Sequence, residues 1–180
     1  MDLITRAAGE HSYGYTTLSD MHGVHAEMLM DFGVLRLRRG ETWTETQPLE
    51  KAYLLVSGKV RFSWENQQHE EERANCFDVP PTALHVCRAV SVTLECLSDE
   101  CEIDILRTDN EREFPSRLYL PEDTPDEFRG AGTMHETSTR IVRTIFDDRN
   151  APYASEIFAA TTILSALSLP LIVWIAGLVL

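Results

Sequence analysis

The sequence predicts an all-β protein, an antiparallel β-sandwich or barrel followed by an apolar C-terminal segment. Three observations lead to this fold class. Short runs of alternating apolar and polar residues recur about every ten residues, with turn-forming residues between them. No stretch before Glu156 carries the apolar stripe of a helix. The 180 residues, 43% hydrophobic and 25% charged, are enough for one globular domain rather than two.

The strand pattern begins after an N-terminal arm. Residues 1–30 show no sustained period, and we expect irregular or short edge structure there. From residue 31 to residue 113 the alternation of apolar and polar residues is typical of strands, and we assign this range to the barrel. Its first strand is expected at 32–38, before the turn at Arg39-Gly40. Residues 41–46 then alternate acidic residues with Thr and Trp, which favour a pleated surface.

The next two strands are expected at 52–56 and 59–64, joined into a hairpin by the turn Ser57-Gly58. In the second strand Val60, Phe62 and Trp64 share one face, so we expect that face to be buried. Two further alternating runs, at 90–94 and 103–107, flank the turn at Ser98-Asp99. The spacing of all these short strands is typical of a sandwich or barrel.

The residues after the barrel change in composition. Residues 114–132 are rich in proline and charge, which favours an arm that covers the barrel rather than a core strand. One more strand is expected at 140–146. Residues 157–180 contain no charge at all, and as a helix they would extend about 36 Å at roughly 1.5 Å per residue. That length permits a membrane span of about 30 Å.

The charge balance excludes one class of function. Asp and Glu number 29 against 16 Lys and Arg, which gives a net charge of −13. A body this acidic repels the phosphate backbone, so we expect no nucleic-acid partner.

The four cysteines predict no structural zinc site, because no two of them form a Cys-x-x-Cys pair. Cys96 and Cys101 flank a short turn, and a disulfide between them is geometrically feasible. The N-terminal residues have no apolar secretory segment. Reduced thiols and a cytoplasmic location are therefore the expectation.

Several motifs carry a family resemblance. Gly40 with Glu-Thr-Trp-Thr-Glu, followed by Tyr53-Leu-Leu-Val-Ser-Gly-Lys-Val60, resembles the first half of a cupin barrel of the jelly-roll type. In order, the segments at 77–84, 114–118, 121–123, 129–132 and 138–145 resemble the N-terminal half of the 5-deoxy-glucuronate isomerases of inositol breakdown. These enzymes are relatives of the 5-keto-4-deoxyuronate isomerases. The resemblance extends from about residue 31 to residue 154.

The resemblance implies a two-cupin enzyme that interconverts an aldose-type uronate and its ketose. Such a reaction moves a proton between neighbouring carbons, with a divalent metal, zinc, polarising the carbonyl. In this family the metal site lies in the second cupin, introduced by a Trp-Ser-Ser-Tyr-Pro-Pro-His type segment that this chain lacks. We therefore expect 114–156 to hold the covering arm and the start of a second cupin whose metal-binding part is missing. This chain alone is then expected to bind no cofactor and to show no metal-dependent isomerisation.

The first cupin itself offers few metal ligands. By the spacing of metal-binding cupins, the His-x-His positions fall on Thr46 and Pro48, and a carboxylate position falls near Glu50. His85 is a weak candidate for a fourth ligand, and a structural role is expected for it. His22 and His25 would share a helical face, but we expect them to be polar arm residues. No catalytic residue can be assigned.

Three interpretations of 157–180 remain open, namely out-of-frame translation, a membrane anchor, or an apolar segment docked on the barrel. Two functions remain open with them. The first is the uronate isomerase, with a sugar-acid substrate and homo-oligomers as expected partners. The second is a metal-free cupin acting as a binding module, tail-anchored to a membrane if the segment spans one.

Overall fold

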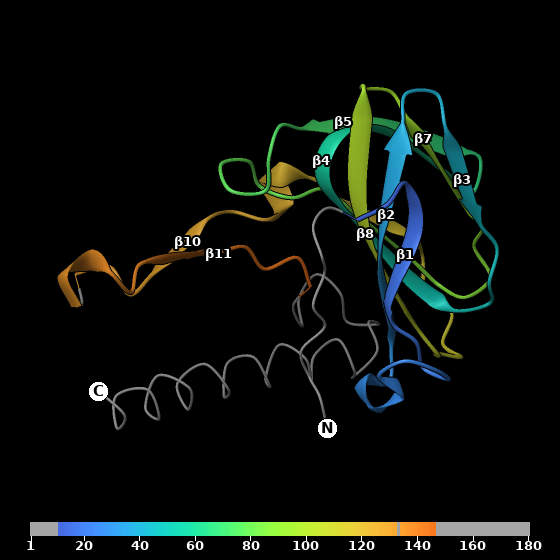
Figure 1. Ribbon diagram of the computed structural model, residues 1–180, viewed down its shortest axis with the longest axis horizontal. Helices are drawn as coiled ribbons and strands as arrows, with labels where there is room; N and C mark the ends of the chain where they lie inside the picture. Colours follow the sequence, from blue (N-terminus) through green and yellow to red (C-terminus); the bar gives the residue numbers. More distant parts are fainter. Residues whose placement is uncertain (1–10, 133, 147–180) are drawn as a thin grey trace. The chain divides into compact units, whose positions relative to one another are not determined.

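The computed structural model describes residues 11–132 and 134–146. Contacts divide the chain into Met1–Ile145 and Phe146–Leu180, and the described fold belongs to the first unit. Nine antiparallel strands form its main sheet (Figure 1), at Gly14–Ser19 (β1), Asp31–Arg38 (β2), Thr42–Glu45 (β3), Glu50–Trp64 (β4), Gln67–Arg73 (β5), Ala83–Val86 (β6), Val92–Cys96 (β7), Glu100–Thr108 (β8) and Arg117–Tyr119 (β9). A hairpin of Glu127–Arg129 (β10) and Arg140–Val142 (β11) stands apart. The helices of the described residues are single 3₁₀ turns at Ala26–Met28, Pro121–Asp123 and Met134–Glu136.

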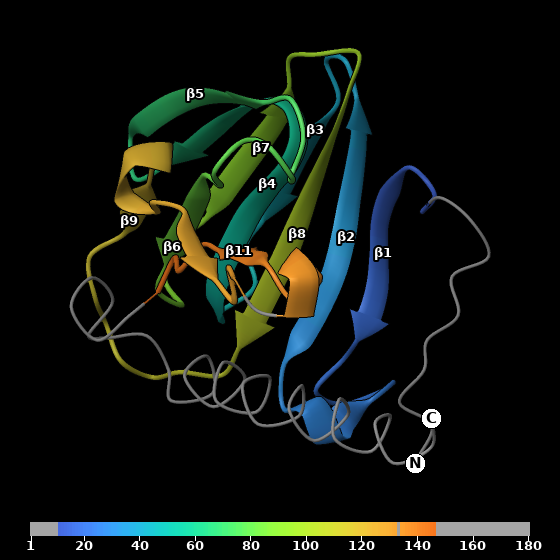
Figure 2. The same cartoon turned by 90° about the vertical axis from the view of Figure 1, so that its left-hand side faces the viewer.

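The strands form two layers that share β4. The first half of β4 pairs with β8 and β6, in a layer of order β1-β2-β8-β4-β6-β9. The second half pairs with β5 and β7, and β7 pairs with β3. Figure 2 shows β1, β2 and β8 side by side in the first of these layers. The predicted all-β antiparallel architecture is thus confirmed for the described residues.

The predicted hairpin at 52–64 is wrong, because β4 is one continuous strand that bends between the layers. The pairing register shifts between Leu55 and Ser57, so the strand is bulged there. Gly58 has φ +92°, and a Cβ at this position would lie 2.4 Å from the Glu100 carbonyl oxygen. Glycine is required because the bend brings its backbone against the start of β8. The Ser57-Gly58 pair is typical of a turn, but in this chain it lies at the bend of a continuous strand.

Every second side chain of a strand points into the barrel interior. Apolar members include Leu35, Tyr53, Leu55, Val60, Phe62, Leu84, Leu94, Ile103 and Ile105, all fully buried. The predicted burial of the Val60, Phe62 and Trp64 face is confirmed. At about 25 cal/mol per Å² of apolar surface, this cluster is the main stabilising contribution to the fold.

The N-terminal arm contributes strand β1, which pairs antiparallel with β2 at the edge of the sheet. Irregular or short edge structure is the prediction for residues 1–30, and within them Gly14–Ser19 forms an edge strand. Strand β5 was not expected, because Gln67–Arg73 is a charged run without apolar alternation. It forms because β4 offers a long edge and the two-residue turn at Glu65-Asn66, with φ 44° and 62°, returns the chain along it.

The chain beyond β8 contacts the barrel at several points. Phe114 is buried, and β9 pairs with β6. The strand predicted at 140–146 is shorter in the structure, where β11 comprises Arg140–Val142. The guanidinium group of Arg143 pairs with Asp126 and donates hydrogen bonds to the carbonyl oxygens of Cys76 and Phe77.

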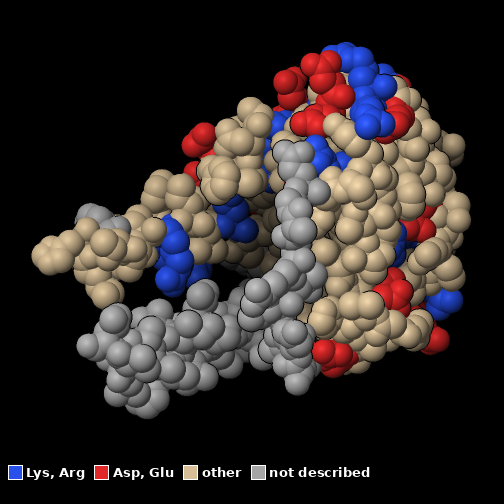
Figure 3. Space-filling model, in the orientation of Figure 1, with Lys and Arg blue, Asp and Glu red and all other residues tan. Residues whose placement is uncertain are grey.

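The described cysteines are all unpaired thiols, including Cys96 and Cys101. Burial, together with the neighbouring Cys96 side chain, raises the pKa of the Cys101 thiol far above its usual range. Figure 3 shows acidic and basic side chains mixed at the end of the barrel where β2 ends and β8 begins. These include the exposed pair Arg39–Asp99 at 3.0 Å.

The apolar segment 157–180 lies outside the described residues, and so do the three interpretations of it. Among the residues that the structure describes, none of the helices is long and apolar enough to cross a membrane.

Candidate functional site

Two neighbours at the start of β4 define two polar clusters. Glu50 and Lys51 are both fully buried, although most Glu and Lys side chains in proteins are exposed. Successive side chains of a strand point to opposite faces, so one of the two lies inside the barrel and the other outside. Lys51 has the parity of Tyr53 and Leu55, which belong to the core. Lys51 therefore faces the barrel interior and Glu50 faces outward.

The inner cluster is built around Arg107 at the end of β8. Its Nη2 atom lies 2.6 Å from Oε2 of Glu45, and both residues are more than nine-tenths buried. Its Nη1 atom donates a hydrogen bond of 2.8 Å to the hydroxyl of Tyr15. The guanidinium carbon also lies 4.5 Å from the centre of the Tyr15 ring. A buried ion pair of this kind requires good geometry to offset the cost of removing two charges from water.

Tyr15 and Trp43 form an aromatic wall beside this ion pair. Their ring centres are 5.7 Å apart and the rings are stacked at 27°. Gly33 on β2 makes room for this arrangement, because a Cβ there would lie 2.5 Å from the Tyr15 ring. Burial raises the pKa of the Tyr15 phenol, which stays protonated at neutral pH.

Lys51 lies next to the ion pair without joining it. Its Nζ atom donates one hydrogen bond of 2.8 Å to the carbonyl oxygen of Gln47, and within the described residues it forms no ion pair. Burial lowers the pKa of its ammonium group, while the neighbouring Glu45 and Cys87 oppose that shift and Arg107 adds to it. The amine is thus held in surroundings that disfavour its charge.

Several polar atoms of the inner cluster lack hydrogen-bond partners among the described residues. They are Nε of Arg107, Nε1 of Trp43 and the hydroxyl of Tyr53. Burial raises the pKa of the Tyr53 phenol far above its usual range. A buried donor without a partner costs about 1–3 kcal/mol, so a structural core would not be expected to collect three of them.

A cavity of about 310 Å³ opens onto this cluster. Its lining includes Tyr15, Trp43, Glu45, Arg107, Asp20 and Asp31. Thr17 and Gln47 complete it. The cavity thus combines an aromatic wall, three carboxylates, one guanidinium group and two uncharged polar side chains.

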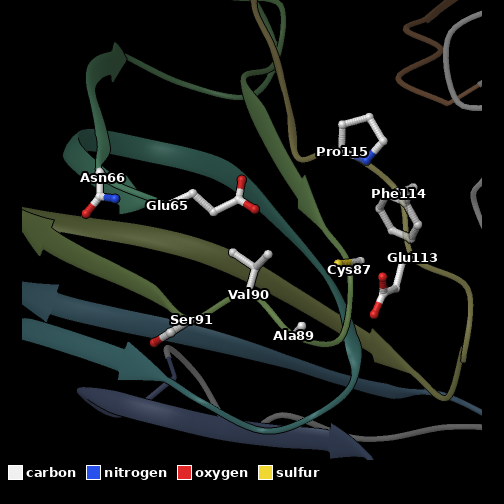
Figure 4. Close-up of a pocket in the computed structure, with 9 residues that line it drawn as sticks. All are labelled: Glu65, Asn66, Cys87, Ala89, Val90, Ser91, Glu113, Phe114 and Pro115. Carbon is white, nitrogen blue, oxygen red and sulfur yellow. The ribbon is translucent and has the colours of Figure 1, made fainter.

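A second, larger pocket of about 730 Å³ lies on the side of Cys87 and Val90. Figure 4 shows the Glu65 side chain extending over it from the β4–β5 turn, while Phe114 and Pro115 bound its opposite side. Its lining has two carboxylates, Glu65 and Glu113, and no basic residue. Lys51 interacts electrostatically with residues of both pockets, namely Glu45 and Arg107 of the smaller and Cys87 of the larger.

The outer cluster holds the one histidine that the sequence analysis singled out as a weak metal candidate. His85 lies on the outer face of β6, with Nε2 2.8 Å from Oε1 of Glu50. The amide of Asn110 donates a hydrogen bond to Oε2 of Glu50. The His85 ring packs against Phe114 with ring centres 4.7 Å apart. These contacts join the segment after β8 to the barrel.

The ligand positions deduced from cupin spacing lie one residue away from those that face the interior. Thr46 and Pro48 are exposed, and Glu50 points out of the barrel. The interior positions are Glu45 and Lys51. A shift of one residue changes the face of a strand, so spacing counted from Gly40 selects the wrong parity.

The residues present in the barrel do not fit a divalent metal. Among the residues that the structure describes, no group of three or more His, Cys, Asp or Glu side chains could hold one. His85 is bonded to a single carboxylate, and His25 lies 3.7 Å from Glu27. In the inner cluster one carboxylate faces two basic side chains, whereas a divalent cation requires several anionic or neutral donors.

The sequence patterns predict no functional role for Glu45, Lys51, Arg107 or Tyr15. A signal for Arg107 was present, because it continues the apolar alternation of Ile103 and Ile105 with a charge. No equivalent signal existed for Tyr15, whose strand lies in the arm.

Comparison with known proteins supports this architecture. The sequence profile of the KduI/IolB family matches residues 3–166. The match begins within the arm and includes the first ten residues of 157–180. No curated protein sequence matches the chain.

Among solved structures, an IolB-like protein of Salmonella typhimurium LT2 superposes with a TM-score of 0.66 at 21% identity, over 77% of this chain and 52% of that one. This chain therefore spans about half the length of that relative. An RmlC-like cupin of Methanocaldococcus jannaschii with a double-stranded β-helix fold gives a TM-score of 0.45 at 14% identity, over 61% of this chain and 93% of that one. At such identities the likeness concerns the fold alone.

Proposed function

This chain belongs to the KduI/IolB family, and from that premise we propose that it serves the interconversion of an aldose-type uronate and its ketose. The reaction would be of the 5-deoxy-glucuronate type found in inositol breakdown. The observation that carries the proposal is the family match over residues 3–166, which is nearly the whole chain.

The chemistry of the proposed reaction defines what the chain must supply. An aldose–ketose isomerisation removes a proton from one carbon and returns it to its neighbour, so a base must lie beside the substrate. A divalent ion supplies polarisation of the carbonyl where one is bound. The described barrel does not fit such an ion, so the proposal places no metal-dependent step in it.

The proposal is tested in the host that encodes the chain. Disruption of the gene is expected to abolish growth on myo-inositol, to leave growth on glucose intact, and to cause the aldose uronate to accumulate. Normal growth on myo-inositol without accumulation would overturn the proposal. Reintroducing the gene is the matched control.

A second assay addresses the metal-free character of the barrel. The purified chain is incubated with the aldose uronate, and ketose formation is followed by NMR with added zinc and with a chelator. We expect no turnover that depends on the metal. Ketose formation that the chelator abolishes would contradict this expectation.

A second candidate function is a metal-free binding module, and the inner cluster favours it. Lys51 and Arg107 place two basic groups beside Glu45 in the barrel, where a metal-dependent enzyme would gather ligands. Such a module would bind a small-molecule ligand without converting it, as a homo-oligomer, and it would be membrane-tethered only if 157–180 is an anchor. Growth on myo-inositol that survives gene disruption, together with small-molecule binding by the purified chain, would favour this function over the isomerase.

A further inference from the structure

We propose that the cavity beside Tyr15 and Trp43 binds a neutral polyhydroxylated ring of monosaccharide size. This site is independent of the proposed uronate reaction, because it is argued from the cavity alone and takes an uncharged ligand. Its volume of about 310 Å³ lies at the lower end of the range for small-molecule sites, which is about 300–1,000 Å³.

The aromatic wall matches the apolar side of such a ring. Tyr15 and Trp43 are stacked and half-buried, and both line the cavity. Aromatic side chains offer a large rigid surface at little cost in conformational entropy, and their rings accept contact with C–H groups. The Tyr15 ring is fixed by Arg107 and requires glycine at position 33.

The rim of the cavity accepts hydrogen bonds. Oδ1 of Asp31 accepts a hydrogen bond of 2.8 Å from the backbone N–H of Met21, and Oδ1 of Asp20 accepts one of 2.7 Å from that of His22. In the described part of the chain the second oxygen of each carboxylate has no partner. Ionised carboxylates are acceptors only, so they select a ligand that brings hydroxyl donors.

Two residues of the lining, Trp43 and Arg107, hold buried donors that lack partners within the part of the chain that the structure describes. Arg107 is more than nine-tenths buried, and its Nε has no partner among the described residues; Nε1 of Trp43 has none either. A hydroxyl group both donates and accepts, so adjacent hydroxyls suit a wall where acceptors and donors lie side by side. A ligand oxygen near these atoms would offset the cost of leaving them unpaired.

The charges at the cavity disfavour an anion. The lining carries the carboxylates of Asp20, Asp31 and Glu45 against the one guanidinium group of Arg107, and the ammonium group of Lys51 next to Glu45 still leaves the balance negative. A carboxylate on the ligand would meet like charges, and such juxtaposition is a means of rejecting a competing ligand. A neutral ring is therefore preferred over the sugar acid of the same shape.

The test uses the full chain with its tryptophans labelled with ¹⁵N, so that each indole N–H gives an NMR signal. Trp43→Phe identifies the signal of Trp43, and Trp64→Phe identifies that of Trp64, so the third signal belongs to Trp174. Glucose, galactose and myo-inositol serve as neutral probes, and glucuronate is the charged counterpart of glucose. We expect at least one neutral ring to shift the Trp43 signal while leaving that of the buried Trp64 in place. Glucuronate should bind about tenfold more weakly than glucose.

Variants establish whether the rim carries the recognition. Asp31→Asn should weaken neutral-ring binding about tenfold and reduce the preference over glucuronate, because one negative charge is lost. Asp109→Asn, at an exposed aspartate outside the cavity, is the matched control and should change neither. An unchanged Trp64 signal shows that the variants are folded.

Three results would overturn the proposal. No probe shifts the Trp43 signal at millimolar concentration, in which case the cavity holds only water. Glucuronate binds as tightly as glucose, which would refute the charge argument. Asp31→Asn and Asp109→Asn have equal effects, which would place the binding elsewhere. A gene disruption that leaves growth on myo-inositol unchanged bears on the proposed isomerisation and not on this site.

Discussion

The two buried clusters at the start of β4 differ in how completely their polar atoms are paired. Outside the barrel, Glu50 bonds both His85 and Asn110, and the histidine ring packs on Phe114. Inside, Lys51 donates one hydrogen bond, and Nε of Arg107 has no partner among the residues described. The two clusters begin at the adjacent residues Glu50 and Lys51, which are both fully buried.

This difference separates a structural role from a binding role. A fully bonded polar cluster fixes one arrangement of the chain, and the outer cluster attaches the segment after β8 to the barrel. Unpaired buried donors destabilise an empty protein and become useful when a ligand pairs them. The inner cluster also opens onto a cavity, and the His85–Glu50 pair lines neither described pocket.

The largest expected effect comes from breaking the inner ion pair. Arg107→Met removes the partner of Glu45 and leaves a buried carboxylate uncompensated, so the free energy of unfolding should fall by about 3–5 kcal/mol. Urea denaturation at neutral pH measures this change. Adding Glu45→Gln to that variant should recover part of the loss, because the orphaned charge is then removed.

The matched control for that prediction is an exposed pair. Arg39→Met breaks the contact with Asp99 at 3.0 Å and should cost less than about 1 kcal/mol, because water screens it. Equal losses at Arg107 and Arg39 would mean that the inner pair is not buried as described.

A smaller loss of stability is expected in the outer cluster. Glu50→Gln keeps the shape but replaces charge-assisted hydrogen bonds to His85 and Asn110, so unfolding should become about 1–3 kcal/mol easier. The chain should still bind a neutral ring with unchanged affinity, because Glu50 faces away from the cavity. A changed affinity at the Trp43 signal would show that the two clusters are coupled.

The smallest effect is a gain of stability at the outer face of β8. Burial, with a lesser contribution from Glu102, raises the pKa of Asp104 from 3.8 to about 6. Between these values the folded chain retains a proton that the unfolded chain has released, so the contribution of Asp104 to stability falls as pH rises from about 4 to 6. Asp104→Asn should remove that slope and stabilise the chain at pH 7 by up to about 2 kcal/mol, after allowance for solvent screening.

Unfolding in urea at several pH values between 4 and 7 measures this effect. His11 and Arg73 also act on Asp104 and lower its pKa. A variant whose stability is the same as that of the parent at both ends of this range would contradict the assigned shift.

How much of this structure was accessible from sequence varies with the kind of feature. The buried face of Val60, Phe62 and Trp64 follows from local alternation, and so does the all-β class. The continuity of β4 does not, because Ser57-Gly58 suits both a turn and a bend. Only the contact of Gly58 with the start of β8 decides between them.

The candidate site shows the same division. In β8 the charged residue Arg107 continues the alternation of the apolar residues Ile103 and Ile105. This pattern alone indicates that a charged side chain lies inside the barrel. Its partners Glu45 and Tyr15 come from strands far away in the sequence, and their positions depend on sheet register. Counting residues from Gly40 selects positions that face out of the barrel, because a shift of one residue moves a side chain to the other face of a strand.

The sequence by itself determined the fold class, the family resemblance and the negative charge balance, because these depend on local patterns and composition. Only the tertiary structure decided which polar residues lie inside the barrel and which of them meet. Lys51 and Glu50 illustrate the physical reason. They are adjacent in sequence and similar in polarity, but the pleat sends them to opposite faces, where different distant strands supply their partners.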